Sequence, residues 1–102
     1  MAMTPESKVK KKCTDILKAE GVYFFLPATY GMGRSGIPDI ICCAYGRFLA
    51  IECKAGKGVT TALQKRELRV IGESGGTAIV MREDSQELLK KVLKILKDKQ
   101  VE

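Results

Sequence analysis

Histidine is absent from this sequence of 102 residues. Without it, the chain cannot supply the base of Ser-His or Cys-His nucleophilic catalysis. The four cysteines, at 13, 42, 43 and 53, form no Cys-x-x-Cys pair, so a zinc site of the usual ligand spacing is not expected. General-base chemistry would therefore have to use lysine, aspartate, glutamate or a metal-bound water.

Long apolar runs are missing as well. The N-terminus lacks the apolar stretch of a signal peptide, and no run approaches the roughly 20 residues of a membrane span. Three cysteines lie in apolar segments, where cysteine behaves as a small hydrophobic residue. We therefore expect a cytoplasmic protein with no membrane partner, and a phage or bacterial origin is compatible with this.

The charge of the chain is strongly unbalanced. The 18 lysines and arginines outnumber the 12 aspartates and glutamates, which gives a net charge of +6 and a pI of about 9.3. This excess favours a polyanionic partner, nucleic acid before an anionic membrane, although charge can also serve solubility alone. The length predicts a single domain, residues 1–102, with a modest core that a dimer interface would supplement.

Hydrophobic periodicity and turn residues predict the order helix, three strands, helix, strand, helix. The first helix starts at Thr4-Pro5-Glu6 and ends at Gly21. The remaining elements are expected as a strand over 22–28, the two strands discussed next, a helix from Thr60 or Thr61 to about Ser74, a strand over 77–81, and a helix from Ser85.

Two short apolar segments contain charged residues, which are rare in the strands of a protein core. They are Ile37-Pro38-Asp39-Ile40-Ile41 and Leu49-Ala50-Ile51-Glu52-Cys53-Lys54, and each reads as a strand. Between them, Tyr45-Gly46 predicts a tight turn that would pair Ala44 with Arg47.

The same register places Asp39 directly opposite Glu52. Like charges in such a pair are destabilising, so a divalent cation between the two carboxylates would explain them. Strand alternation puts Lys54 on the same face as Glu52. The three side chains together predict a site for metal-assisted phosphodiester cleavage.

Two further polar residues each allow two interpretations. Glu6 falls inside the apolar stripe of the first helix, so it either serves the helix dipole or completes the acidic site. Gln64 either closes a capping box with Thr61 or faces the site. The segment Tyr30–Gly36 holds three glycines and Arg34, and is either a plain connection or a phosphate contact.

The last helix carries a wide apolar stripe. It covers an arc of roughly 160°, which is more than one packing contact requires. The stripe is most simply core, and alternatively it is a dimer face; its members are Leu88, Leu89, Val92, Leu93, Ile95 and Leu96.

Gly36-Ile37-Pro38-Asp39, followed by Ile51-Glu52-Cys53-Lys54, resembles the PD-(D/E)XK nuclease superfamily and, within it, the VRR-NUC family. The family pattern has Gly-x-Pro-Asp, then Glu-x-Lys on the next strand, then a Gln on the following helix, and often a Glu in the first helix. The resemblance covers nearly the whole chain as a minimal, stand-alone member. It implies an α/β fold with a restriction-endonuclease-like α-β-β-β-α-β core, whose mixed sheet is flanked by helices.

The chemistry that the resemblance implies is hydrolysis of a DNA phosphodiester with Mg²⁺ or Mn²⁺. Asp39, Glu52 and the Cys53 backbone carbonyl would bind the metal, with Glu6 contributing through a water. Lys54 would orient or deprotonate the attacking water and stabilise charge, and Gln64 would position Lys54 or the water. Phosphate contacts are expected from Lys8, Lys11, Lys12, Arg34 and Lys57.

Small members of this family suggest a structure-selective homodimer that prefers branched DNA. Such an enzyme would resolve four-way junctions in DNA repair, recombination or replication. Flaps and plain duplex are alternative substrates. A non-catalytic nucleic-acid-binding module and a structural interaction protein are the rival functions.

Overall fold

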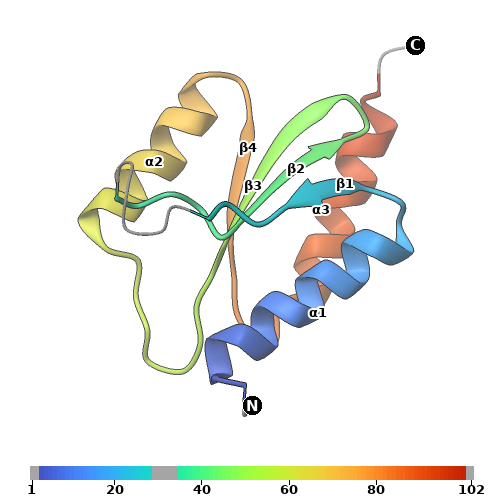
Figure 1. The fold of residues 1–102 in the computed structure, drawn as a ribbon. Coiled ribbons are helices and arrows are strands. Elements are labelled where there is room, and N and C mark those ends of the chain that lie inside the picture. Colours follow the sequence, from blue (N-terminus) through green and yellow to red (C-terminus); the bar gives the residue numbers. More distant parts are fainter. Residues whose placement is uncertain (1–2, 29–34, 101–102) are drawn as a thin grey trace.

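The computed structural model describes residues 3–28 and 35–100. Its elements follow the predicted order (Figure 1). They are α1 (Pro5–Ala19), β1 (Tyr23–Phe25), β2 (Ile40–Ala44), β3 (Arg47–Cys53), α2 (Ala62–Glu73), β4 (Thr77–Met81) and α3 (Gln86–Asp98). None of the helices in these two ranges is long and apolar enough to cross a membrane.

The predicted helix ends are confirmed. The Thr4 hydroxyl accepts a hydrogen bond from the Ser7 N–H at 3.1 Å, and Pro5 is the first helical residue. Beyond the other end of α1, Gly21 adopts a φ of +69°, which glycine tolerates without steric cost. Thr61 is the N-cap of α2, as expected.

The four strands form one mixed sheet in the order β1-β2-β3-β4. β1, β2 and β3 are antiparallel neighbours, whereas β4 runs parallel to β3. The turn between β2 and β3 has φ values of +55° at Tyr45 and +81° at Gly46, as a type I′ hairpin requires. Ala44 therefore pairs with Arg47, and the predicted register holds as far as Ile40 with Ile51.

One face of the sheet forms the core. α1 and α3 lie on this side and α2 lies on the other (Figure 1). The buried side chains come from alternate strand positions and from the inner stripes of α1 and α3. They include Val9, Cys13, Leu17, Ile40, Cys42, Leu49, Ile51, Leu89, Leu93 and Leu96.

The wide stripe of α3 is divided by this packing. Leu89, Leu93 and Leu96 are buried in the core, so the simpler interpretation is confirmed for them. Leu88 and Ile95 stay nearly half exposed. The surface of α3 that is left for a partner is therefore narrower than the stripe suggests.

The other face of the sheet is only partly covered. α2 packs against the β4 side of this face. Tyr23, Phe25 and Phe48 point to the same side and remain largely exposed, at 68%, 48% and 47%. The register also places Glu52 on this face. The polar residues of interest and the exposed aromatic residues thus share one side of the sheet.

The predicted bounds of β1 and the predicted start of β2 are wrong. β1 spans Tyr23–Phe25 rather than 22–28, because the chain reaches Pro27, which has no N–H to donate to a ladder. β2 begins at Ile40 rather than Ile37. Pro38 lies just before it and is likewise unable to donate, so Asp39 sits at the mouth of the hairpin, outside the ladder.

Candidate metal centre

Three carboxylates meet at the open end of the β2–β3 hairpin. One oxygen each from Glu6, Asp39 and Glu52 lies within 4.8 Å of the other two. Glu6 comes from the first turn of α1, Asp39 from the residue before β2, and Glu52 from β3. Two of the three were predicted from hairpin register alone, and Glu6 joins them because α1 packs its inner stripe against the same sheet.

Asp39 is held by the backbone of the opposite strand. The predicted register is confirmed, but the ladder ends at Ile40 with Ile51, one residue before Asp39 and Glu52, so these two residues lie opposite each other just beyond the ladder. The Cys53 N–H donates to Asp39 Oδ2 at 2.8 Å. The carboxylate therefore takes the place of a ladder carbonyl and is fixed next to Glu52.

Gly36 explains how the Gly-x-Pro-Asp string reaches this position. Its φ is +85°, and a Cβ built there would lie 2.6 Å from the Leu63 carbonyl oxygen. Only glycine allows the segment to pass so close to the backbone of α2. The contact brings the segment that carries Asp39 against the start of α2, next to Gln64.

Glu52 is the most buried of the three acids, with 2% of its surface exposed. Its pKa is raised from 4.5 to about 7, mainly by burial and secondly by the negative charge of Asp39. Lys54 opposes this shift and Glu6 adds to it. In such surroundings, the ionised form of the Glu52 carboxyl is stabilised by any positive charge placed beside it.

Lys54 lies against Glu52, as strand alternation predicts. Its Nζ is 3.8 Å from Glu52 Oε2, and 8% of the residue is exposed. The loop that follows is held by the segment after β4. The Gly56 N–H donates to a Glu83 carboxylate oxygen at 2.7 Å, and Arg82 Nη2 donates to the Gly58 carbonyl at 2.8 Å. Lys54 is therefore a buried ammonium at the base of an anchored loop.

Gln64 satisfies both of its interpretations at once. Its Oε1 accepts the Thr61 N–H at 2.9 Å, which completes the capping box. Its Nε2 donates to Glu52 Oε2 at 3.2 Å. The cap orients the amide so that its donor end is directed at Glu52.

Lys10 also lies at the acidic cluster, although it was not among the site residues predicted from the sequence. Its Nζ lies 3.6 Å from Asp39 Oδ1, and it is partly buried beside a polar hollow of about 220 Å³ that Asp39 also lines. Its position could have been predicted from its spacing to Glu6, because Lys10 follows Glu6 by four residues and residues four apart on a helix share a face.

The Cys53 main chain, but not its thiol, is suited to the metal role. A hydrogen bond with Cys13 and burial raise the pKa of the thiol, which stays protonated in the core. In a strand, the N–H and C=O of one residue point to the same edge. Since the Cys53 N–H points at Asp39, its carbonyl is directed to the same side.

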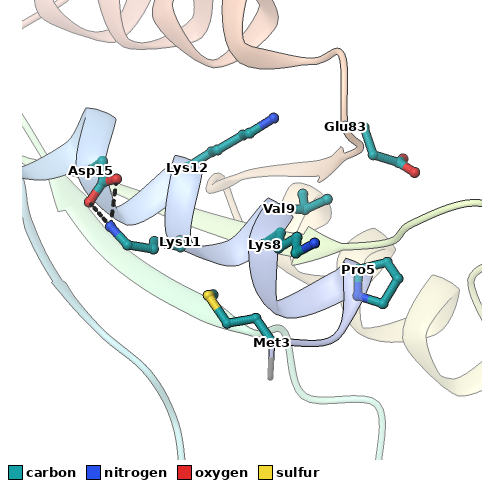
Figure 2. A pocket seen from close by; sticks show the side chains of 8 residues that line it. All are labelled: Met3, Pro5, Lys8, Val9, Lys11, Lys12, Asp15 and Glu83. Carbon is teal, nitrogen blue, oxygen red and sulfur yellow. Dashed lines mark hydrogen bonds and ion pairs between the residues drawn. The ribbon is translucent and has the colours of Figure 1, made fainter. Parts of the chain in front are cut away.

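The lysines predicted to bind phosphate do not join the acidic cluster. Figure 2 shows Lys8, Lys11 and Lys12 around a separate pocket of about 370 Å³ on another face of α1. Lys11 forms an ion pair with Asp15 at 3.0 Å. Lys57 is exposed in the loop after β3, and Arg34 lies outside the described residues.

The donor set of the cluster fits a hard divalent cation. All three side chains offer carboxylate oxygens, which Mg²⁺ and Mn²⁺ prefer. Three acids close together, one of them fully buried, also leave an excess of negative charge that Lys10 and Lys54 only partly balance. The residues present are therefore compatible with the metal centre that the sequence predicts.

A solved structure described as a VRR_NUC domain is similar to this chain. The TM-score is 0.69, the sequences are 22% identical, and the match covers 90% of this chain and 97% of that chain. A scan against protein-family models finds no match, and neither does a search of curated proteins. The comparison confirms the predicted fold, an α/β fold of the VRR-NUC type with a mixed sheet between helices.

Proposed function

We propose that this chain, folded like a VRR_NUC domain, is a nuclease of the PD-(D/E)XK type that hydrolyses DNA phosphodiester bonds with Mg²⁺ or Mn²⁺. The observation that carries this proposal is the convergence of Glu6, Asp39 and Glu52 within 4.8 Å, with Lys54 3.8 Å from Glu52. Residues 1–102 would make up one nuclease domain.

The acids would hold the cation. Asp39, Glu52 and the Cys53 carbonyl would bind it directly, and Glu6, which is exposed in the first turn of α1, would reach it through a water. The bound cation would supply positive charge that polarises the phosphate and favours attack by water. Gln64 keeps the Glu52 carboxylate oriented through its 3.2 Å hydrogen bond.

Lys54 would act on the attacking water and on the charge that develops at phosphorus. Its ammonium is 10% exposed at the side chain, so it operates where water screens little. As an ammonium, Lys54 would orient the attacking water; as a neutral amine, it would accept a proton from that water. Both roles act in the chemical step rather than in holding DNA.

The net charge of +6 suits a polyanionic substrate such as DNA. We propose that Lys8, Lys11, Lys12, Arg34 and Lys57 contact backbone phosphates without reading sequence. Because the three α1 lysines surround a pocket away from the acids, they would contact a part of the DNA distant from the cut.

We further propose that the enzyme acts as a homodimer on branched DNA, resolving four-way junctions in repair, recombination or replication. One site cuts one strand, and a two-fold dimer supplies two symmetric nicks. The exposed Tyr23, Phe25 and Phe48 on the open sheet face offer apolar surface for such an interface, together with Leu88 and Ile95 of α3.

The proposed activity is tested by incubating the protein and Mn²⁺ with labelled four-way junction, flap and linear duplex. We expect cleavage with preference for the junction, and loss of cleavage in Glu52→Gln with DNA affinity retained. Glu73→Gln is the matched control, because the Glu73 side chain is 68% exposed and its carboxylate lies 3.6 Å from exposed Arg69 on α2. No cleavage of any substrate by the wild type would favour a non-catalytic nucleic-acid-binding module.

A further inference from the structure

Both oxygens of Asp39 are engaged. Oδ2 accepts the Cys53 N–H at 2.8 Å, and Oδ1 lies 3.6 Å from the ammonium of Lys10. The backbone bond is part of the fold, because it closes the hairpin. A divalent cation that binds Asp39 through Oδ1, the oxygen not used in the backbone bond, would therefore have to displace Lys10.

Lys10 is the one lysine of α1 that the described residues place at the acidic cluster. It follows Glu6 by one helical turn, and the burial of Val9 and Cys13 fixes that face of α1 against the sheet. The pair with Asp39 is only partly buried, with side-chain exposures of 34% and 21%. The ammonium can thus leave the carboxylate without entering the core.

The charges of the acidic cluster explain the position of Lys10 next to Asp39. Three carboxylates crowd within 4.8 Å, and Lys54 lies against only one of them, Glu52. Lys10 neutralises a second, Asp39, in the protein without a metal. Once a divalent cation occupies the cluster, that ammonium is repelled by it and needs another anion.

The hollow beside Lys10 offers space for that anion. It measures about 220 Å³, is lined largely by polar surface, and is bordered by Lys10, Ser35, Gly36 and Asp39. A phosphate next to the scissile bond would lie beside the carboxylates that hold the cation. The flexible stem of lysine spans such a short displacement without any change of the backbone.

We propose that Lys10 is an exchangeable counter-cation of the metal centre. It pairs with Asp39 when no divalent cation is bound, and it turns to a phosphate of the DNA backbone when one is. This inference rests on the proposed nuclease function and adds a positioning residue to it.

The first test measures Ca²⁺ binding by calorimetry in the absence of DNA. Lys10→Met keeps an apolar stem and removes the charge, so Ca²⁺ should bind on the order of tenfold more tightly than to the wild type. Lys10→Arg keeps the charge and should retain the wild-type affinity. Lys18→Met, on the exposed last turn of α1, is the control and should change nothing.

The second test measures DNA binding in Ca²⁺ and single-turnover cleavage in Mn²⁺. Lys10→Met should weaken junction binding and slow cleavage by about tenfold, although it binds the cation more tightly. If Lys10 had a purely structural role, Lys10→Met would change the affinity for Ca²⁺ and the affinity for DNA in the same direction.

The outcomes separate the two proposals. If the wild type binds Ca²⁺ and cleaves DNA, and Lys10→Met binds Ca²⁺ equally or more weakly, the proposed role of Lys10 is overturned. The nuclease function is not affected by that result. Tighter Ca²⁺ binding with unchanged DNA affinity and cleavage overturns the transfer to phosphate. A wild type that neither binds Ca²⁺ nor cleaves DNA overturns the nuclease function itself.

Discussion

Without metal, the stability of this protein should fall as the pH rises from about 5 to about 8. Glu52 is 2% exposed, and its pKa is raised from 4.5 to about 7 by burial and by Asp39. Between these two values the folded state binds more protons than the unfolded state does. The free energy of unfolding therefore decreases with pH across this window, which is the reverse of the usual carboxylate behaviour.

The size of the effect follows from the shift. One pKa unit corresponds to about 1.4 kcal/mol, so the full displacement is worth about 3 kcal/mol, and most of it is lost between about pH 5 and pH 8. Glu83 also titrates, but its pKa is lowered from 4.5, so its effect lies below this range. Cys42, whose pKa burial raises to about 12, titrates above it.

Urea unfolding in EDTA at several pH values provides the assay. We expect the wild type to lose about 2 to 3 kcal/mol from about pH 5 to pH 8, and Glu52→Gln to show little of this dependence. Saturating Mg²⁺ should restore stability at the upper pH by binding the folded state. A wild type whose stability is flat or rises over this range in EDTA would refute the reasoning.

Three further predictions concern single side chains and assembly. Lys54→Ala should slow single-turnover cleavage by about 10²-fold or more while leaving DNA affinity in Ca²⁺ little changed; the opposite pattern would reassign Lys54 to phosphate binding. Gly36→Ala, with its Cβ 2.6 Å from the Leu63 oxygen, should lower the free energy of unfolding by about 3 kcal/mol and reduce cleavage. Gly21→Ala, at positive φ in open space, is its control and should cost about 1 kcal/mol; equal losses would contradict the steric account. Light scattering at micromolar concentration should give twice the chain mass of 11.2 kDa, and a monomer mass would defeat the proposed dimer.

The fold was largely predictable because local signals and hydrophobic periodicity agreed. Tyr45-Gly46 supplied the two positive φ values of the hairpin turn, and that turn alone sets the register of β2 and β3. Thr4 and Thr61 marked the helix starts through their capping hydrogen bonds. These features depend on residues close in sequence, so the amino-acid order carries them directly.

The parts of the site that were missed depend on contacts between distant segments. Asp39 satisfies the Cys53 N–H with its side chain, which strand pairing rules do not anticipate. Lys10 reaches the cluster because α1 packs its inner stripe against the core face of the sheet. The same packing turns Lys8, Lys11 and Lys12 toward another pocket, and net charge alone could not distinguish these lysines from Lys10.

Glu6 and Gln64 illustrate why a local explanation does not exclude a functional one. The first turn of α1 favours an acid for its dipole, and that acid also lies within 4.8 Å of Asp39 and Glu52. The capping box of α2 accounts for Gln64, and the same amide donates to Glu52. At both residues, the two interpretations drawn from the sequence are therefore compatible with each other.

The central claim is that a divalent cation binds between Asp39 and Glu52, and direct titration with Mn²⁺ followed by electron paramagnetic resonance tests it most directly. Mn²⁺ should bind to the wild type and to Asp15→Asn equally, and Asp39→Asn should weaken binding by about tenfold or more, which is about 1.4 kcal/mol. Equal Mn²⁺ binding by the wild type and Asp39→Asn would contradict the account.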